Sequence, residues 1–242
     1  MSHAPILALV LLLGLCAPCQ QASEAAGSTL LSRLKKGETV TVVAFGDSLI
    51  ENSAWPTLLQ AWLDGLGLPG KAEVVNAGKA GSTTASHGVK NLAKDVIERR
   101  PGLVFVAFGM NDCIVRPEQP AAVPLPDFRS NLARIIGGIR KGLPKAEIVL
   151  MTMNPARDVP QSPNAGTYRR ALADYYQAVR DAAREGDCLL VDTYPIWQAV
   201  LAKDPSQAKA LIPDGVHPNA MGSERITLPA VQAMLELRPR KR

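Results

Sequence analysis

Histidine and aromatic residues are scarce in this sequence, and both shortages narrow the functions open to it. Only three of its 242 residues are histidine, and no group of His, Cys, Asp or Glu has the spacing of metal ligands. Aromatic residues make up 5% of the chain, which lacks the interleaved basic and aromatic residues of a nucleic-acid-binding face. We therefore expect no metal, no cofactor and no nucleic-acid partner.

Hydrophobic runs long enough to cross a membrane are also missing. Residues 6–15 are ten consecutive apolar or glycine residues, which is too short for a bilayer and suits the core of a signal peptide. The five residues before that run carry no Lys or Arg, so an uncleaved anchor remains the alternative. We expect a signal peptide over approximately residues 1–25, a secreted or periplasmic protein, and no stable membrane span after the leader is removed.

Cysteine occurs at four positions, two of them in this leader. The residues before Cys16 and Cys19 are leucine and proline, which are poor small-residue positions for lipoprotein processing, so we expect no lipid anchor. Cleavage would leave Cys113 and Cys188, which could form a bridge in an oxidising compartment. Cys113 follows one predicted strand and Cys188 begins another at the opposite edge of the sheet, which predicts two separate thiols.

Excess positive charge is confined to one end of the chain. Four of the five net positive charges come from residues 238–242, which leaves +1 for everything else. We interpret this segment as a solvated basic tail. The remaining residues, 26–237, have the length and apolar content of one globular domain.

Strand and helix patterns alternate along that domain. Apolar runs of strand length lie at residues 40–46, 72–76, 103–108, 146–151 and 188–191. Helical spacing of apolar residues follows at 55–66, 89–97, 128–143, 168–182 and 196–201, and a last helix begins near Asn219 and is kinked or broken at Pro229. Five such alternations predict the α/β class, with a five-stranded parallel sheet between two layers of helices.

Polar clusters follow three of these strands and precede the last helix. Ser48 follows the first strand, Gly81 the second and Asn111 the third, and residues 214–219 form the fourth cluster. Ligands of open α/β sheets bind outside the carboxyl ends of the strands. We therefore expect the four clusters to meet at one edge of the sheet.

A serine in this position suggests nucleophilic catalysis if a base lies within reach. His3 is in the leader and His87 reads as a surface residue at a helix start, so His217 is the candidate base. Asp214 precedes His217 by three residues and could bind one imidazole nitrogen while the other faces Ser48. Taken alone, an Asp-x-x-His pair is more often structural than catalytic.

Acyl transfer also needs hydrogen-bond donors for the tetrahedral oxyanion. The backbone N–H groups of Ser48 and Gly81 and the side-chain amide of Asn111 are the candidates. Asp112, next to Asn111, is interpreted as a turn and helix-capping residue.

These four clusters together resemble the SGNH or GDSL hydrolase family. The matching blocks are Gly46-Asp47-Ser48-Leu49, Asn76-Ala77-Gly78-Lys79-Ala80-Gly81-Ser82-Thr83, Gly109-Met110-Asn111-Asp112 and Asp214-Gly215-Val216-His217-Pro218, in family order. The resemblance implies a flavodoxin-like three-layer fold and metal-free ester hydrolysis through an acyl-enzyme. It implies Ser48 as nucleophile, His217 as base and Asp214 as its orienting group. Ser48, Gly81 and Asn111 would form the oxyanion hole.

Other functions remain as alternatives. A trypsin-like protease also uses Gly-Asp-Ser, but its serine comes last of the three catalytic residues and glycines follow it, where this chain has Leu49-Ile50. A non-catalytic carbohydrate- or surface-binding module could share the fold. Among ester substrates we favour a small acyl group on a polar carrier such as a carbohydrate, because the rim loops 113–126 and 153–166 carry Arg116 and Arg157. A lysophospholipid or aryl ester is the alternative.

Overall fold

The computed structural model describes residues 27–237 and contains one parallel sheet of five strands. The strands are β1 (Thr39–Gly46), β2 (Lys71–Gly78), β3 (Leu103–Ala107), β4 (Glu147–Thr152) and β5 (Leu189–Asp192), in the spatial order β2-β1-β3-β4-β5. All five predicted strands are present, and the predicted α/β fold is confirmed. The expected signal peptide at residues 1–25 and the basic tail at 238–242 lie outside the described residues.

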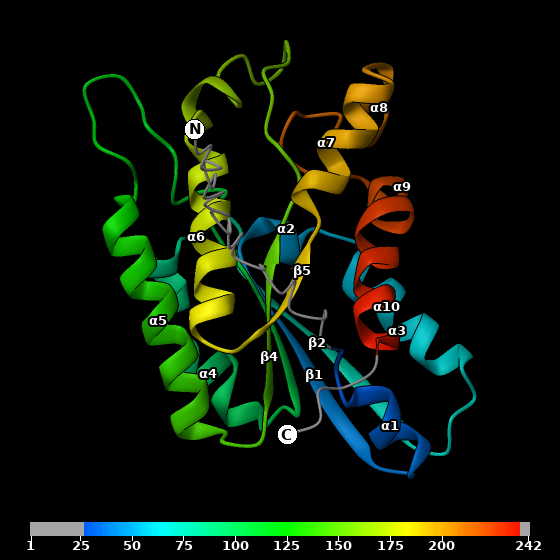
Figure 1. Cartoon of the computed structure of the whole chain (residues 1–242). Helices are drawn as coiled ribbons and strands as arrows, with labels where there is room; N and C mark the ends of the chain where they lie inside the picture. Colours follow the sequence, from blue (N-terminus) through cyan, green and yellow to red (C-terminus); the bar gives the residue numbers. More distant parts are fainter. Residues whose placement is uncertain (1–26, 238–242) are drawn as a thin grey trace, which may run out of the picture.

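Helices cover both faces of the sheet (Figure 1). One face carries α1 (Leu30–Lys35), α3 (Trp55–Gly65) and α10 (Leu228–Glu236), and the other carries α4 (Leu92–Asp95), α5 (Leu125–Gly142) and α6 (Leu172–Glu185). The short α2 (Ser48–Glu51) follows β1, and α7 (Tyr194–Lys203), α8 (Ser206–Leu211) and α9 (Ala220–Gly222) follow β5. The strand order reverses between β1 and β3, which places the residues after β1 at the switch point where ligands of such sheets bind.

The sheet is apolar because its strands are covered on both faces. Every residue of β3 is buried, as expected for the central strand of a parallel sheet. On one face Trp55 packs edge-on against Phe105, with ring centroids 5.4 Å apart. The amphipathic helix α5 turns a stripe of five predicted apolar residues inward: Phe128, Leu132, Ile135, Ile136 and Ile139.

One predicted helix is wrong. In place of a continuous helix at 89–97, the chain forms a π-turn, η1 (Thr84–Gly88), then α4, then a 3-10 turn, η2 (Ile97–Arg99). Helical structure starts early because Thr83 and Ser86 cap each other and the distant Asp112 accepts from the N–H of Thr84 at 2.8 Å. Thr84 and Asp112 are 28 residues apart in the sequence, so no local sequence pattern predicts this contact.

The last helix is interrupted, but the interruption precedes Pro229 and does not fall at the proline as predicted. The Asn219 side chain accepts from the N–H of Gly222 at 3.0 Å and caps α9. A second π-turn, η4 (Ser223–Thr227), then leads into α10, whose first turn contains Pro229. A wider turn before the proline accommodates its ring and its missing N–H.

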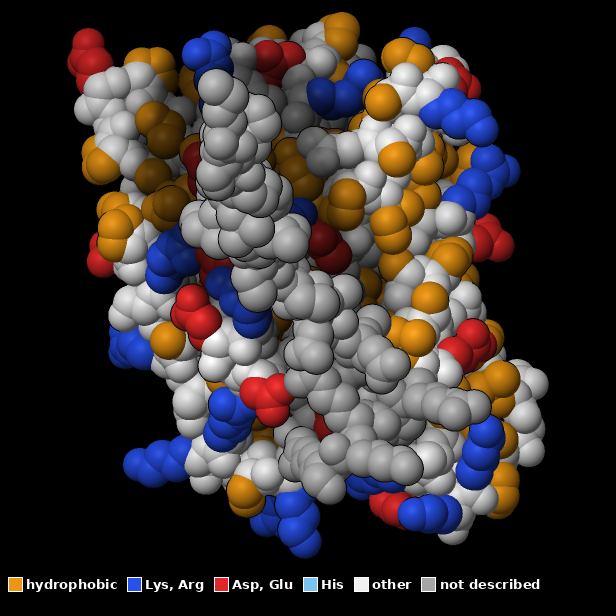
Figure 2. All heavy atoms as spheres, in the orientation of Figure 1, with side chains coloured by type: hydrophobic (Ala, Val, Ile, Leu, Met, Phe, Trp, Pro, Cys, Tyr) orange, Lys and Arg blue, Asp and Glu red, His pale blue; other side chains and the backbone are white. Residues whose placement is uncertain are grey.

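Charged side chains of both signs are interspersed on the face drawn in Figure 2. No helix within residues 27–237 combines the length and the apolar character needed to cross a bilayer.

Candidate active site

Ser48 stands at the start of α2, directly beyond the carboxyl end of β1. Asp47 caps this helix by accepting from the N–H of Leu49 at 2.8 Å. Gly46 makes the turn possible, because a Cβ there would lie 2.2 Å from the carbonyl oxygen of Ala107 on β3. Ser48 is nearly buried, with 6% of its surface exposed.

A chain of two hydrogen bonds joins Ser48, His217 and Asp214. The Nε2 atom of His217 lies 2.8 Å from Ser48 Oγ, and its Nδ1 atom lies 2.6 Å from Asp214 Oδ2. The other carboxylate oxygen of Asp214 accepts from the N–H groups of Val216 and His217 at 2.9 and 2.7 Å. The structure thus brings together three residues that the sequence separates by up to 169 positions.

These contacts also decide the charge of Asp214. Burial by itself raises the pKa of this carboxyl, but the hydrogen bonds from His217 and Val216 outweigh burial and lower its pKa below the ordinary value. Asp214 is therefore ionised near neutral pH. An ionised carboxylate at Nδ1 keeps a proton on that nitrogen and leaves Nε2 free to accept one from Ser48.

The loop that carries His217 is bound to the loop after β4. The side chain of Asn154 donates to the carbonyl of Val216 at 2.7 Å, and the N–H of Arg157 donates to the carbonyl of Gly215 at 2.9 Å. Gly215 has φ +81°, and a Cβ there would lie 2.2 Å from the carbonyl oxygen of Arg157. This close approach requires glycine and fixes where the imidazole stands.

Three of the predicted donors have an N–H without an acceptor among residues 27–237. The N–H of Ser48 is at the first helical position, and neither it nor the N–H of Gly81 has an acceptor among residues 27–237. The Asn111 amide has two N–H bonds. One donates to the carbonyl of Ser82 at 2.9 Å, and the other has no acceptor among residues 27–237. The backbone N–H groups of the other residues from 78 to 84 all have acceptors. In chain order, and leaving out residue 81, these acceptors are Asn76 Oδ1, Gly46 O, Glu51 Oε2, Lys79 O, Ser86 Oγ and Asp112 Oδ1.

The loop that carries Gly81 is bound to α2 and to the turn after β3. The Glu51 carboxylate accepts from the N–H of Ala80 at 2.6 Å, and the Asn76 amide donates to the carbonyl of Ile50 at 2.8 Å. Together with the bond between Asn111 and Ser82, these contacts hold all three donors in one arrangement. The four polar clusters of the sequence therefore meet at one edge of the sheet, as predicted.

His87 differs from the sequence prediction. It is 6% exposed, not a surface residue, and packs against Phe45 with ring centroids 4.9 Å apart. Its Nε2 atom lies 3.4 Å from the carbonyl of Ala77 and 3.8 Å from the Asp95 carboxylate. Glycine and serine neighbours in the sequence gave no sign that the π-turn would bury this ring.

Two buried carboxyl groups lie beneath the site. Asp112 accepts from the N–H and hydroxyl of Thr84 and from the N–H of Gly109, which is the turn and capping role expected of it. Sequence reasoning missed the environment of Asp47: its Oδ2 atom is buried and has no hydrogen-bond partner among residues 27–237. Burial raises the pKa of Asp47 to about 7, against the hydrogen bond from Leu49 and with a further rise from the Asp112 carboxylate.

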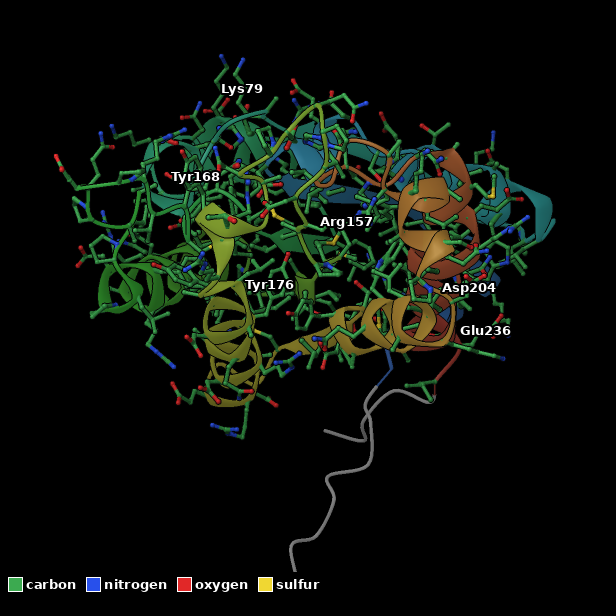
Figure 3. All side chains as sticks on the ribbon, turned by 90° about the horizontal axis from the view of Figure 1, so that it is seen from above. Lys79, Arg157, Tyr168, Tyr176, Asp204 and Glu236 are labelled. Carbon is green, nitrogen blue, oxygen red and sulfur yellow. The ribbon has the colours of Figure 1, made fainter. Side chains whose placement is uncertain are left out.

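The two thiols and the two rim arginines have different surroundings. Cys113 and Cys188 are separate, as predicted, and burial raises the pKa of the Cys113 thiol to about 12. Arg116 is exposed, whereas Arg157 is half-buried, with its Nε atom buried and unpaired. Seen from above the carboxyl ends of the strands, Arg157 lies nearer the centre of the molecule than Lys79 (Figure 3).

Residues 27–237 contain no group of three His, Cys, Asp or Glu side chains that could hold a metal ion.

Comparisons with known proteins identify a family and several similar folds. A family model described as "GDSL-like Lipase/Acylhydrolase family" matches residues 44–225, a range that includes Ser48 and His217. A protein named "Uncharacterized lipoprotein YqeF" from Bacillus subtilis is 29% identical over 197 residues, which cover 72% of this chain and 79% of that protein. The acetylxylan esterase Axe2 from Geobacillus stearothermophilus is 25% identical, with a TM-score of 0.66 over 86% of this chain and 100% of Axe2. A lipase/acylhydrolase from Enterococcus faecalis shares the fold at 23% identity and a TM-score of 0.64, over 84% of this chain and all of that one.

Proposed function

Because this chain belongs to the GDSL-like lipase/acylhydrolase family and is an ester-bond hydrolase, we propose that Ser48 is its nucleophile, His217 its general base and Asp214 the residue that orients the base. The observation that carries this proposal is the continuous pair of hydrogen bonds, 2.8 Å from Ser48 Oγ to His217 Nε2 and 2.6 Å from His217 Nδ1 to Asp214 Oδ2. Members of such a triad act as a unit.

The reaction has two halves. Ser48 Oγ attacks the ester carbonyl carbon while its proton moves to His217 Nε2, and the carbonyl oxygen becomes an oxyanion. The histidine then gives that proton to the departing alcohol, which leaves an acyl group on Ser48. Water repeats the attack with the same base, and the acid product leaves as the serine regains its proton.

The oxyanion hole consists of the N–H groups of Ser48 and Gly81 and the side-chain amide of Asn111. These are the donors that remain without an acceptor or with an N–H to spare at this edge of the sheet. Each such donor contributes about 3–4 kcal/mol to the transition state in comparable enzymes.

Axe2 supports these roles. Substitutions of one serine, one aspartate and one histidine in Axe2 are described as catalytic mutants, and the aspartate there precedes the histidine by three residues. Asp214 and His217 have the same spacing and residue types.

The substrate that we favour is an O-acetylated carbohydrate. Axe2 is an acetylxylan esterase, and a second similar structure, AlAXEase, is an acetyl xylan esterase as well. In the chain itself, polar residues hold the segments that carry the donors: Glu51, Asn76 and Ser82. A lysophospholipid or aryl ester is the alternative substrate class.

We also place the protein outside the cytoplasm. YqeF is named a lipoprotein, and the apolar run at residues 6–15 suits a leader. Our expectation that this chain itself carries no lipid stays a prediction, which fractionation of expressing cells into membrane and soluble extracytoplasmic material would check.

Hydrolysis of p-nitrophenyl acetate by Ser48→Ala and His217→Ala variants tests the mechanism. We expect each substitution to lower kcat by about 10⁴-fold or more, with the circular dichroism spectrum unchanged. Ser32→Ala is the matched control, because this exposed serine on α1 lies far from the site and bonds only to the carbonyl of Thr29. Turnover near the wild-type rate in the Ser48 or His217 variant would reject the mechanism. Comparison of acetylated xylan with lysophospholipid then separates the two substrate classes.

A further inference from the structure

A polar cavity of about 600 Å³ is lined in part by the loop that carries Gly81. Gly81 and Ser82 are part of its lining, whereas Ser48 and His217 are not. Its size is within the range of small-molecule sites in proteins. Because β2 is an edge strand, no neighbouring strand covers the end of β2, and the cavity opens between that end and the helical segments η1, α4 and η2.

Positive charge predominates in this cavity. Lys79, Lys94 and Arg99 line it, and Asp95 is the one carboxylate among its lining residues. The Asp95 carboxylate lies 3.8 Å from the buried His87 ring, and its backbone carbonyl accepts from Arg99 Nε at 3.0 Å. Neither lysine has an ion-pair partner within residues 27–237, and the terminal guanidinium nitrogens of Arg99 have none either. The cavity therefore has three cationic side chains and one carboxylate, an excess of two positive charges.

Three of the other lining side chains keep hydrogen-bonding capacity that suits a sugar. The Asn91 amide has no partner among residues 27–237, the Ser82 hydroxyl donates to Lys79 and can still accept, and the Ser86 hydroxyl accepts from Thr83 and can still donate. The Asn76 amide, in contrast, bonds to Ile50 and Gly78. None of the large apolar side chains exposed on residues 27–237 lines this cavity: Leu66, Val115, Ile196, Met221 and Leu237. A fatty acyl chain would find no apolar wall there, whereas a hydroxylated ring with one negative charge would find partners for both features.

We propose that this cavity binds a carboxylate-bearing sugar in the alcohol part of the substrate, with Lys94 and Arg99 as the groups that select the negative charge. The inference deepens the proposed function and rests on it. The acyl group would occupy the site at Ser48, and the polysaccharide chain would cross the Gly81 loop into the cavity. Lys79, which projects from the rim in the view from above the strand ends (Figure 3), adds to the attraction on approach.

The test compares two matched pairs of substrates. The first pair is an O-acetylated xylo-oligosaccharide with a uronic acid substituent and the same oligosaccharide without it. We expect the wild-type enzyme to show about fivefold lower KM for the acidic member at low salt, since each exposed charge contact is worth a factor of a few. The difference should shrink as NaCl is added, because the contacts are exposed and screened. The second pair is lysophosphatidic acid and monoacylglycerol, which reports whether a phosphate is preferred instead.

The double variant Lys94→Gln/Arg99→Gln should abolish the preference for the acidic oligosaccharide. Its kcat and KM for p-nitrophenyl acetate should match the wild type, which separates this inference from the proposed mechanism. Lys90→Gln is the control, because Lys90 is exposed on the same segment and does not line the cavity. Equal KM values for the two oligosaccharides, a preference that survives in the double variant, or a preference for the phosphate pair alone would each overturn the proposal. If the wild-type enzyme does not hydrolyse p-nitrophenyl acetate, that result would instead reject the proposed function.

Discussion

Asn111→Ala is the substitution whose effects the structure separates most clearly. The amide of Asn111 donates one N–H to the carbonyl of Ser82 at 2.9 Å and leaves its second N–H for an oxyanion. Truncation to alanine removes both donors. Loss of the hydrogen bond to Ser82 lowers the stability of the folded protein. Loss of the other N–H lowers the stability of the transition state alone.

The two losses have different magnitudes and different readouts. Removing one oxyanion donor costs about 3–4 kcal/mol of transition-state stabilisation, so we expect kcat to fall about 10²–10³-fold with little change in KM. The carbonyl of Ser82, in a residue only 6% exposed, loses its donor, which costs about 1–3 kcal/mol of folding free energy. For a domain of about 200 residues this lowers Tm by roughly 2–10 °C.

The assay is the hydrolysis of p-nitrophenyl acetate at 25 °C, with Tm measured in parallel by circular dichroism. Asn131→Ala is the matched control: this asparagine on α5 is also buried, at 7% exposed, and its amide donates to Thr84 Oγ1 at 3.2 Å. It should lose a similar amount of stability with kcat within about threefold of the wild type. A fall in kcat of less than tenfold for Asn111→Ala, or a loss confined to KM, would refute the assignment of Asn111 to the oxyanion hole.

Two further substitutions test the positions around the site. Asp47 has a folded-state pKa of about 7, so between pH 4 and 7 the folded protein holds a proton that the unfolded chain has released, and stability falls as pH rises through that window. Asp47→Asn keeps the acceptor for the N–H of Leu49 but cannot ionise. Its free energy of unfolding relative to wild type should be higher at pH 8 than at pH 5, by about 3 kcal/mol in urea titrations, because about two pH units of that range lie below the folded-state pKa. Equal differences at both pH values would contradict this. Gly215→Ala should lower both kcat and stability, because the new Cβ would lie 2.2 Å from the carbonyl oxygen of Arg157. Gly37→Ala is the control, since Gly37 has a similar φ of +85° but open space around it. This control should lose about 1–2 kcal/mol of stability without a change in kcat. The same kcat for both glycine variants would show that the loop position does not depend on Gly215.

The strands were predictable because burial on both faces leaves a continuous apolar run in the sequence. β3 was predicted at 103–108 and runs from Leu103 to Ala107. β2 was predicted at 72–76 but extends from Lys71 to Gly78, because each of its eight residues pairs with one of β1. Its extra residues are lysine, alanine and glycine, which have little strand preference of their own. Pairing with a neighbouring strand determined where β2 ends.

The helical segment after Gly81 was mispredicted for a related reason. Apolar residues at 89–97 have helical spacing, but capping by Thr83 and Ser86 and the contact from Asp112 start a π-turn earlier. That turn buries His87 against Phe45. The short helices α1 and α8 have six residues each, and their sequence patterns are too brief to distinguish from loops.

The amino-acid sequence by itself determined the order of strands and helices, the polar clusters at the strand ends, and the residue types Ser, Asp and His that the chemistry needs. These follow from periodicity and from short motifs, which depend only on residues close together in the chain. The tertiary structure decided that Ser48 and His217 lie 2.8 Å apart, that the N–H of Gly81 is left without an acceptor, and that Asp47 is buried beneath the site. Each of these depends on contacts between distant segments, and the sheet establishes them by bringing the carboxyl ends of its strands to one edge.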